Sequence, residues 1–135
     1  MRYPITLLGQ QRRPIVSVMA ESPSGVRVVL DALVESGSDI TLFPISLAER
    51  LKLDLTGIAP VPIQTALGPT AAYLPSELLL ELRRPPQVVR WKATIGFLPR
   101  SMAYGILGTK GFFEHFDFHL WHRLAHFDVE QGRDA

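Results

Sequence analysis

Short apolar runs separated by turn residues dominate the hydrophobic pattern of this chain, and most of the runs are of β type. Ile15–Glu21 and residues 26–34 are rich in β-branched residues, and Ser22-Pro23-Ser24-Gly25 between them is typical of a turn. Together the three segments predict a β-hairpin. Between residues 88 and 97, apolar side chains recur at every second position, Trp91 among them, which predicts a strand with one buried face.

One helix is predicted after the apolar residues that end near Pro44. Ser46 and Glu49 have the spacing of a capping box, in which each side chain accepts a hydrogen bond from the free backbone N–H of the other residue. Leu47 and Leu51 would lie on one face of this helix. We expect it to be short and amphipathic and to end before Gly57.

Residues 61–82 predict two further strands around an apolar tip, Leu67-Gly68-Pro69. Apolar tip residues are unusual for a hairpin that merely projects into water. The hairpin is therefore expected either to fold over a bound molecule or to pack its tip on the body of the domain.

Four histidines near the C-terminus allow two interpretations of that region. His115, His119, His122 and His126 have the spacing of a metal site on one face of a helix. Their neighbours alternate between apolar and polar residues on both sides of Trp121-His122-Arg123, which favours two strands. Separate strands do not bring four imidazoles to one ion, so we expect no metal and keep a histidine metal centre as an alternative.

Composition is that of an ordinary folded domain and argues against several classes of function. The 135 residues fit one domain, and 47% of them are hydrophobic against 20% charged. A net charge of +1 with scattered basic residues indicates no nucleic-acid partner. Cysteine is absent, which excludes disulfides, thiolate metal sites and cysteine nucleophiles. No apolar run is long enough for a signal peptide or a membrane span, so we expect a cytoplasmic protein.

The main candidate for catalytic chemistry lies in residues 33–43, where an apolar strand breaks into a polar turn and then becomes apolar again. Glu35 stands at the end of the strand and is followed by Ser36 and Gly37. Catalytic carboxylates are commonly held at such strand ends, because the strand fixes their position and the loop leaves them accessible. The same pattern also fits an ordinary turn with a solvated glutamate.

The order of these features resembles the retropepsin-type aspartic proteases, the retroviral and retroviral-like family. The resemblance comprises a hydrophobic strand, an acidic-Ser-Gly-Ser turn, a short helix, a glycine-tipped hairpin, and Ile106-Leu107-Gly108 before a helical turn with Phe112-Phe113. It implies an all-β fold, a closed retropepsin-like acid-protease barrel with one or two short helices. Residues 1–135 would form a single protomer, with its core over about residues 15–129.

The resemblance also implies an endopeptidase that acts as a homodimer on peptide or protein substrates and needs no cofactor. Each chain of the family contributes one acid-Ser/Thr-Gly loop to a shared site, and this chain holds a single copy of the motif. By resemblance, Glu35 is the catalytic acid, Ser36 locks the two loops together, and Gly37 lets backbone approach the carboxylates. Asp39 would help to hold the main chain of the substrate.

Further roles follow from the same resemblance. Leu67, Gly68 and Pro69 would form the tip of a flap that closes over the peptide. Ile106-Leu107-Gly108 would pack beneath the catalytic loop. The many aliphatic and phenylalanine residues suggest apolar pockets, and hence hydrophobic residues beside the scissile bond.

Two positions depart from the family pattern. Retroviral members carry Asp where this chain has Glu35 and typically Arg where it has Thr109. Glu has the charge and nearly the reference pKa of Asp, but its extra methylene moves the carboxylate by more than ~1 Å, a displacement that is costly in an active site. We therefore expect impaired peptidase activity. The alternative is a non-catalytic retropepsin-like module that binds peptide or dimerises.

Overall fold

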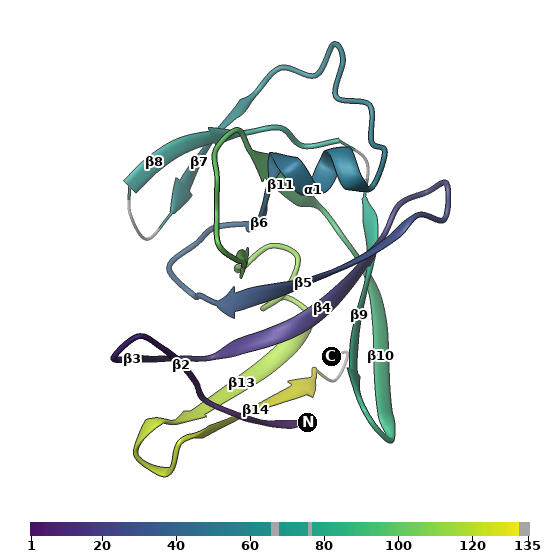
Figure 1. The fold of residues 1–135 in the computed structure, drawn as a ribbon. Coiled ribbons are helices and arrows are strands. Elements are labelled where there is room, and N and C mark those ends of the chain that lie inside the picture. The colour runs from purple at the N-terminus through teal and green to yellow at the C-terminus, as the bar shows by residue number, and fades with distance from the viewer. Residues whose placement is uncertain (66–67, 76, 133–135) are drawn as a thin grey trace.

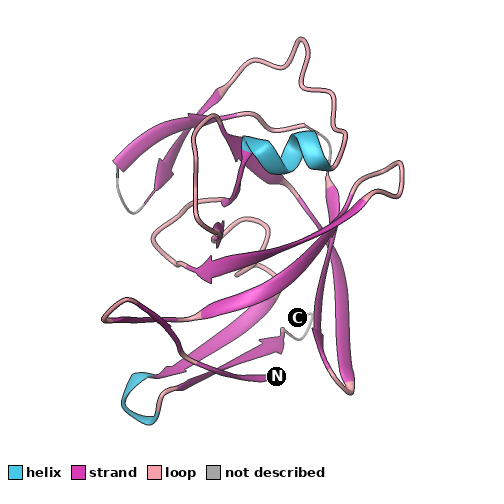
Figure 2. Ribbon diagram, viewed as in Figure 1, coloured by secondary structure: helices cyan, strands magenta, loops and turns pink. Residues whose placement is uncertain are grey.

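A computed structural model describes residues 1–65, 68–75 and 77–132, and strands make up most of it (Figures 1 and 2). The first half contains β1 (Arg2–Pro4), β2 (Thr6–Leu8), β3 (Gln11–Arg13), β4 (Ile15–Glu21), β5 (Arg27–Val34), β6 (Thr41–Pro44), helix α1 (Ile45–Arg50) and β7 (Val61–Thr65). The second half contains β8 (Gly68–Ala72), β9 (Leu78–Arg84), β10 (Gln87–Ala93), β11 (Ile95–Leu98), β12 (Gly105–Leu107), β13 (Phe116–Trp121), the 3-10 turn η1 (His122–Leu124) and β14 (His126–Gln131). Neither helical segment in these ranges is long and apolar enough to cross a membrane.

A seven-stranded sheet with the order β10-β9-β4-β5-β12-β6-β11 forms the body of the protein. In Figure 1 its long strands twist and curl round the interior. Among the described residues, β10 and β11 are the two edge strands of this order and do not pair with each other. The structure therefore shows a curled sheet, and the expected closed barrel is not confirmed. Three smaller sheets complete the fold: β1-β14-β13, β2-β3 and β7-β8.

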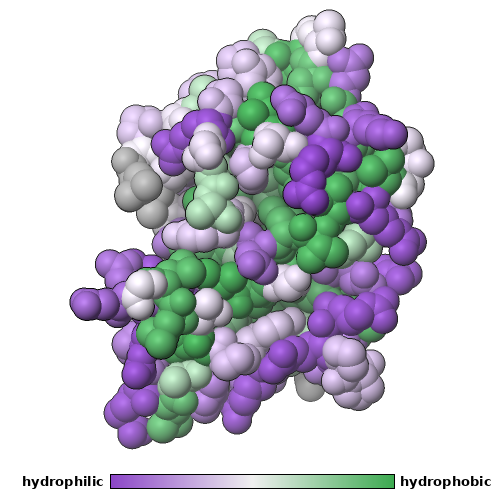
Figure 3. Space-filling model, in the orientation of Figure 1, coloured by the Kyte–Doolittle hydropathy of each residue, from purple (hydrophilic) through white to green (hydrophobic). Residues whose placement is uncertain are grey.

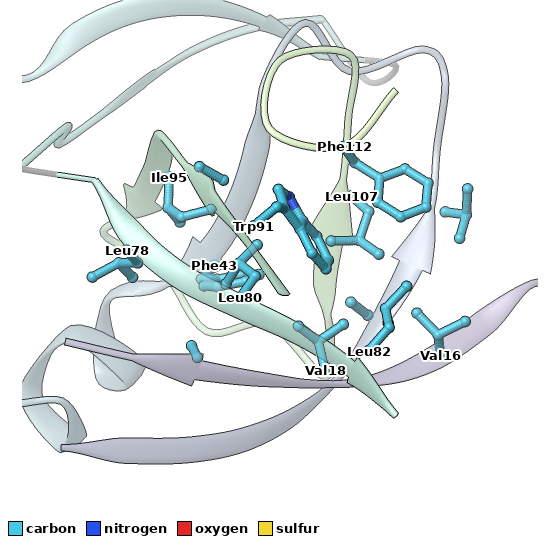
Figure 4. Close-up of a cluster of buried hydrophobic side chains, with 14 of the residues drawn as sticks. Val16, Val18, Phe43, Leu78, Leu80, Leu82, Trp91, Ile95, Leu107 and Phe112 are labelled. Carbon is cyan, nitrogen blue, oxygen red and sulfur yellow. The ribbon is translucent and has the colours of Figure 1, made fainter. Parts of the chain in front are cut away.

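The hydrophobic core lies against the concave side of the curled sheet (Figure 4). Trp91 is central to it, because its ring contacts those of Phe112 and Phe116 at centroid distances of 6.3 and 4.6 Å. The indole Nε1 also donates a hydrogen bond of 2.7 Å to the carbonyl of Gly111, so its one polar group is satisfied. Tyr3, which precedes the expected core of residues 15–129, is buried and stacks on Phe127.

Two of the predicted hairpins are confirmed. Strands β4 and β5 pair antiparallel along their whole length, from Ile15 opposite Leu33 to Glu21 opposite Arg27. Strands β13 and β14 flank the turn at His122–Leu124, as the alternation of their side chains predicted. In both cases local turn residues and period-two patterning were sufficient to identify the pair.

The predicted capping box is wrong. Helix α1 begins at Ile45 with Pro44 as its N-cap, and no side chain makes a capping hydrogen bond. Pro44 is also the last residue of β6 and pairs with Leu98 of β11. Pairing with β11 holds Pro44 in the extended conformation, so the helix starts one residue before Ser46 and places that serine inside its first turn.

Two predicted strands are interrupted. The described residues of the range 61–82 form three strands, because β8 ends at Ala72 and β9 starts at Leu78. Pro75, which lacks a backbone N–H, lies between β8 and β9. Residues 88–97 contain parts of two strands, which pair with β9 and with β6 at opposite ends of the sheet order. Trp91 and Phe97 both face the core, so the alternation was correct although the chain changes partners at Thr94.

Glu81 is a buried carboxylate on the outer side of this sheet. Only 6% of the residue is exposed, and its Oε1 accepts hydrogen bonds from Arg83 at 3.0 Å and Arg90 at 3.1 Å. Burial raises the pKa of Glu81, but the hydrogen bonds and charges of the two arginines outweigh it and leave the pKa below its ordinary value of 4.5. Deprotonated Glu81 therefore stabilises the fold.

We predict that Glu81→Gln lowers the free energy of unfolding at pH 7 by about 2 kcal/mol, because the substitution leaves two arginines without their carboxylate. Because the pKa of Glu81 is lower in the folded than in the unfolded protein, its ionisation stabilises the fold fully at pH values above the unfolded pKa. This stabilisation is lost as the pH falls through the folded pKa. The difference between the two proteins should therefore shrink from pH 7 to about pH 3 in urea unfolding. Glu49→Gln, at an exposed position of α1, is the control, and a difference that did not depend on pH would contradict the assignment.

Candidate active site

Glu35 lies at the end of a strand, as the sequence predicted. It directly follows buried Val34, the last residue of β5. Its backbone N–H donates to the carbonyl of Leu107 in β12 at 2.9 Å. The half-buried side chain turns back on its own loop, and Oε1 accepts the backbone N–H of Gly37 at 2.8 Å. Oε2 accepts no hydrogen bond from the described residues, so one carboxylate oxygen is available for a substrate or a water molecule.

Strand β12 supports this loop from below. It is inserted between β5 and β6, with Ile106 paired to Leu33 in parallel and to Leu42 in antiparallel orientation. Gly108 follows, and its N–H donates to Thr41 Oγ1 at 3.1 Å. A Cβ atom at Gly108 would lie 2.4 Å from the carbonyl oxygen of Ile40, so only glycine fits without displacing the loop.

The remaining loop residues divide into an exposed and a buried group. Ser36, Gly37 and Asp39 are exposed, whereas Ser38 is 1% exposed and its hydroxyl donates to the carbonyl of Ile40 at 2.7 Å. Ser38 also accepts the N–H of Thr109 at 2.9 Å through its backbone carbonyl. The buried serine therefore anchors the loop, and the exposed residues are the ones that can meet another molecule.

The hairpin of β7 and β8 is joined to the same loop. The backbone N–H of Asp39 donates to the carbonyl of Gln64 in β7 at 3.1 Å. Gly68 and Pro69 are the first two residues of β8, and the φ of Gly68 is +111°. Leu67, the third residue of the expected tip, lies outside the described residues. The hairpin thus rises directly beside the loop of Glu35.

A cleft of about 660 Å³ opens next to Glu35. Its lining includes Glu35, Ser38, Thr65 and the support residue Ile106, but not Asp39, Gly68 or Pro69. Other lining residues come from the segments around Pro14, Leu33 and Leu42, from Leu98 at the end of β11, and from the loop between β11 and β12: Arg100, Ser101, Met102, Ala103 and Tyr104. Most of this wall is apolar.

Sequence reasoning missed the loop after β11 and the two arginines of the cleft, Arg13 and Arg100. Residues 99–104 show no alternation and match no catalytic motif, so the only available signal was their place between an apolar strand and Ile106-Leu107-Gly108. Arg13 was counted only among the scattered basic residues. Nothing in either segment reveals that the two share a cleft.

The arrangement supplies one carboxylate and no second acid in the described cleft lining. A half-buried carboxylate with one free oxygen can accept a proton from water, as a general base does. Peptide hydrolysis would also need a proton for the leaving amine, and the described cleft lining offers no second carboxyl group to supply it. Among the described residues no cluster of three His, Asp or Glu side chains could hold a metal ion. His119 and His126 instead lie against the ring of Trp121, at centroid distances of 5.5 and 5.1 Å.

We predict that Gly108→Ala destabilises the fold by about 3 kcal/mol, because the new methyl group meets backbone atoms that cannot move aside cheaply. Gly25→Ala is the matched control, since a Cβ there meets nothing within 4 Å and the cost comes only from a φ of +89°. Chemical denaturation of both variants measures the difference. Equal losses of stability would mean that the loop of Glu35 does not rest tightly on Gly108.

Comparisons with known proteins give likeness of structure only. No family model matches the chain, and no curated protein matches it. The solved EIAV protease complexed with the inhibitor HBY-793 is similar with a TM-score of 0.43 and 15% identity, over 76% of this chain and 88% of that one. A retropepsin-like aspartic protease from Rickettsia conorii is similar with a TM-score of 0.49 and 11% identity, over 90% of this chain and 96% of that one. Likeness at these scores says nothing about chemistry, so the chemistry of this chain has to be judged from its own residues.

Proposed function

We propose that this protein is an endopeptidase of the aspartic type that acts as a homodimer, with Glu35 in place of the usual aspartate. The observation that carries the proposal is the position of Glu35. Its carboxylate is fixed at the end of a buried strand, keeps one oxygen free of in-chain hydrogen bonds from the described residues, and borders a largely apolar cleft of about 660 Å³. An extended peptide with hydrophobic side chains fits such walls.

The chemistry needs two such carboxylates. Two of them a few ångströms apart cannot both ionise, so they share one proton and titrate as a coupled pair. One member then acts as general base towards a water molecule, and the other donates its proton to the peptide carbonyl and later to the leaving amine. A second copy of Glu35 across a two-fold axis supplies the missing group without any metal or organic cofactor.

Exposed apolar side chains support pairing of two chains. Leu7, Leu120 and Leu124 are 65%, 47% and 50% exposed. They belong to the β2-β3 hairpin and to the end of the β13-β14 hairpin, and Figure 3 shows hydrophobic surface at this lower left part of the molecule. In Figure 1 both hairpins project to the same side as the turn that follows β5. A second copy covering this side would bury the apolar surface and bring its own Glu35 loop close.

The remaining residues have supporting roles in this proposal. Ser36 and Gly37 are exposed at the loop and would meet the same loop of the second chain. Asp39 would bind the main chain of the peptide, and the hairpin with Leu67, Gly68 and Pro69 would close over it as a flap. Ile106-Leu107-Gly108 would keep the loop rigid from below.

Glu35 itself limits the rate. Its extra methylene displaces each carboxylate, and an error of about 1 Å in the position of a catalytic group can cost roughly a hundredfold in rate. The bond from Gly37 N–H to Oε1 fixes the longer side chain in a curled form. This curled, hydrogen-bonded form of the Glu35 side chain also favours a second candidate function, a non-catalytic module that uses the cleft to bind peptides.

We predict that Glu35→Asp raises kcat/KM for hydrolysis of hydrophobic peptides by about a hundredfold, because the shorter side chain restores the distance between the two carboxylates. Glu35→Gln should abolish hydrolysis, since an amide can neither accept nor donate the proton. Cleavage of a broad peptide library, followed by mass spectrometry between pH 4 and about pH 7, measures both effects. Saturable peptide binding without turnover in the Asp variant, confirmed folded, would favour the binding module instead.

Shared catalysis predicts a specific response to mixing. When Glu35→Asp and Glu35→Gln chains are refolded together in equal amounts, only dimers of two Asp chains are active, so the rate per Asp chain should fall to about half. The control replaces the Gln chain with bovine serum albumin at equal mass, which should leave the rate unchanged. Sedimentation velocity on the same samples gives the mass of the active species. A rate unaffected by the Gln chain would show that each chain works alone.

A further inference from the structure

The cleft beside Glu35 carries an excess of positive charge. Its charged lining residues are Arg13, Arg100 and Glu35. Five ion pairs occur among the described residues, and neither of these two arginines takes part in them. Within the described part of the chain, the guanidinium of Arg13 donates only to the neutral side chain of Gln11. The cleft therefore presents two guanidinium groups that no carboxylate of the described chain neutralises.

The two arginines reach the cleft from separate segments. Arg13 is the last residue of β3 and precedes Pro14, whose carbonyl accepts the N–H of Val34 at 2.9 Å. Arg100 is exposed and belongs to the loop between β11 and β12. One arginine thus reaches the cleft from the end of β3, and the other lies on the wall formed by the β11-β12 loop.

Apolar residues make up most of the lining between them. Leu33, Leu42, Leu98, Met102 and Ile106 all border the cleft. A ligand that satisfies both features carries a hydrophobic side chain for the walls and a negative charge for the guanidinium groups. A guanidinium presents donors in a planar fork that matches a carboxylate, and it is less strongly hydrated than an ammonium group, so it suits this task at a partly exposed site.

We propose that the cleft selects peptides in which an acidic side chain stands near a hydrophobic one, with Arg100 binding the acid. Arg13 adds a second positive charge to the same lining and so strengthens the attraction for an acidic ligand. This inference rests on the proposed peptide-directed function, and it names the substrate class of that same site. Arg100 is a specificity residue and takes no part in proton transfer.

The test compares the affinity of matched peptides by isothermal titration calorimetry. The probes are acetylated and amidated octapeptides with a central Phe-Leu pair and one flanking residue, placed in turn on either side, that is Glu, Gln or Lys. Blocked termini remove other charges. Binding is measured for the protein as it is and for the variants Arg100→Gln, Arg13→Gln and Arg12→Gln. Arg12 is the neighbour of Arg13 in β3 but does not line the cleft, so Arg12→Gln is the matched control for the loss of one positive charge.

In low salt the Glu peptide should bind about fivefold tighter than its Gln isostere, and the Lys peptide more weakly than both. About 0.5 M NaCl should reduce the preference, since salt screens a partly exposed pair. Arg100→Gln should abolish the preference, Arg13→Gln should reduce it, and Arg12→Gln should leave it unchanged. Circular dichroism confirms that each variant is folded.

The possible failures are distinguishable. Equal affinity for Glu and Gln peptides, with normal binding of both, would overturn the selection for acids and leave the proposed endopeptidase intact. A preference that persists in Arg100→Gln would overturn the role of that residue. If no peptide bound, both the selection and the proposed function would fall.

Discussion

The packing of β12 between β5 and β6 is the constraint on which the rest of the site depends. Gly108 lies so close to the backbone of Ile40 and Ser38 that a methyl group would not fit. This contact, with the hydrogen bonds from Gly108 to Thr41 and from Thr109 to Ser38, turns a polar loop into a rigid one. A carboxylate at the start of a rigid loop keeps its position, which an exposed glutamate on a free turn could not do.

Rigidity alone does not complete the site. One chain supplies a single carboxylate, an apolar cleft and two arginines without ionic partners among the described residues. In the proposal, the acid–base pair and the buried dimer surface both require a second copy of the chain. The cleft, in contrast, is formed by the residues of a single chain. The chemistry and the selection of the ligand are therefore separable, because Glu35 would serve the first and Arg100 the second.

If the proposed endopeptidase function holds, Glu35 is a residue that the fold accepts although the chemistry does not favour it. The side chain keeps the charge of an aspartate, and its extra length is taken up by a hydrogen bond from Gly37 within the same loop. Its backbone N–H donates to the carbonyl of Leu107, a bond that does not depend on the length of the side chain. In the proposal, fold and activity would depend on different properties of this residue, the fold on its backbone and polarity and the activity on the position of its carboxylate.

The sequence by itself determined the features that depend on neighbouring residues. The alternation of apolar and polar residues identified the β13-β14 hairpin, and turn residues identified the β4-β5 hairpin. The end of the apolar run after Val34 identified Glu35 as the residue at the end of a strand. Only the tertiary structure decided where residues 88–97 change partners, why α1 starts at Ile45, and that Arg13 and Arg100 share one cleft with Glu35. Each of these results depends on contacts between segments far apart in the chain, and such contacts leave no periodic signal in either segment.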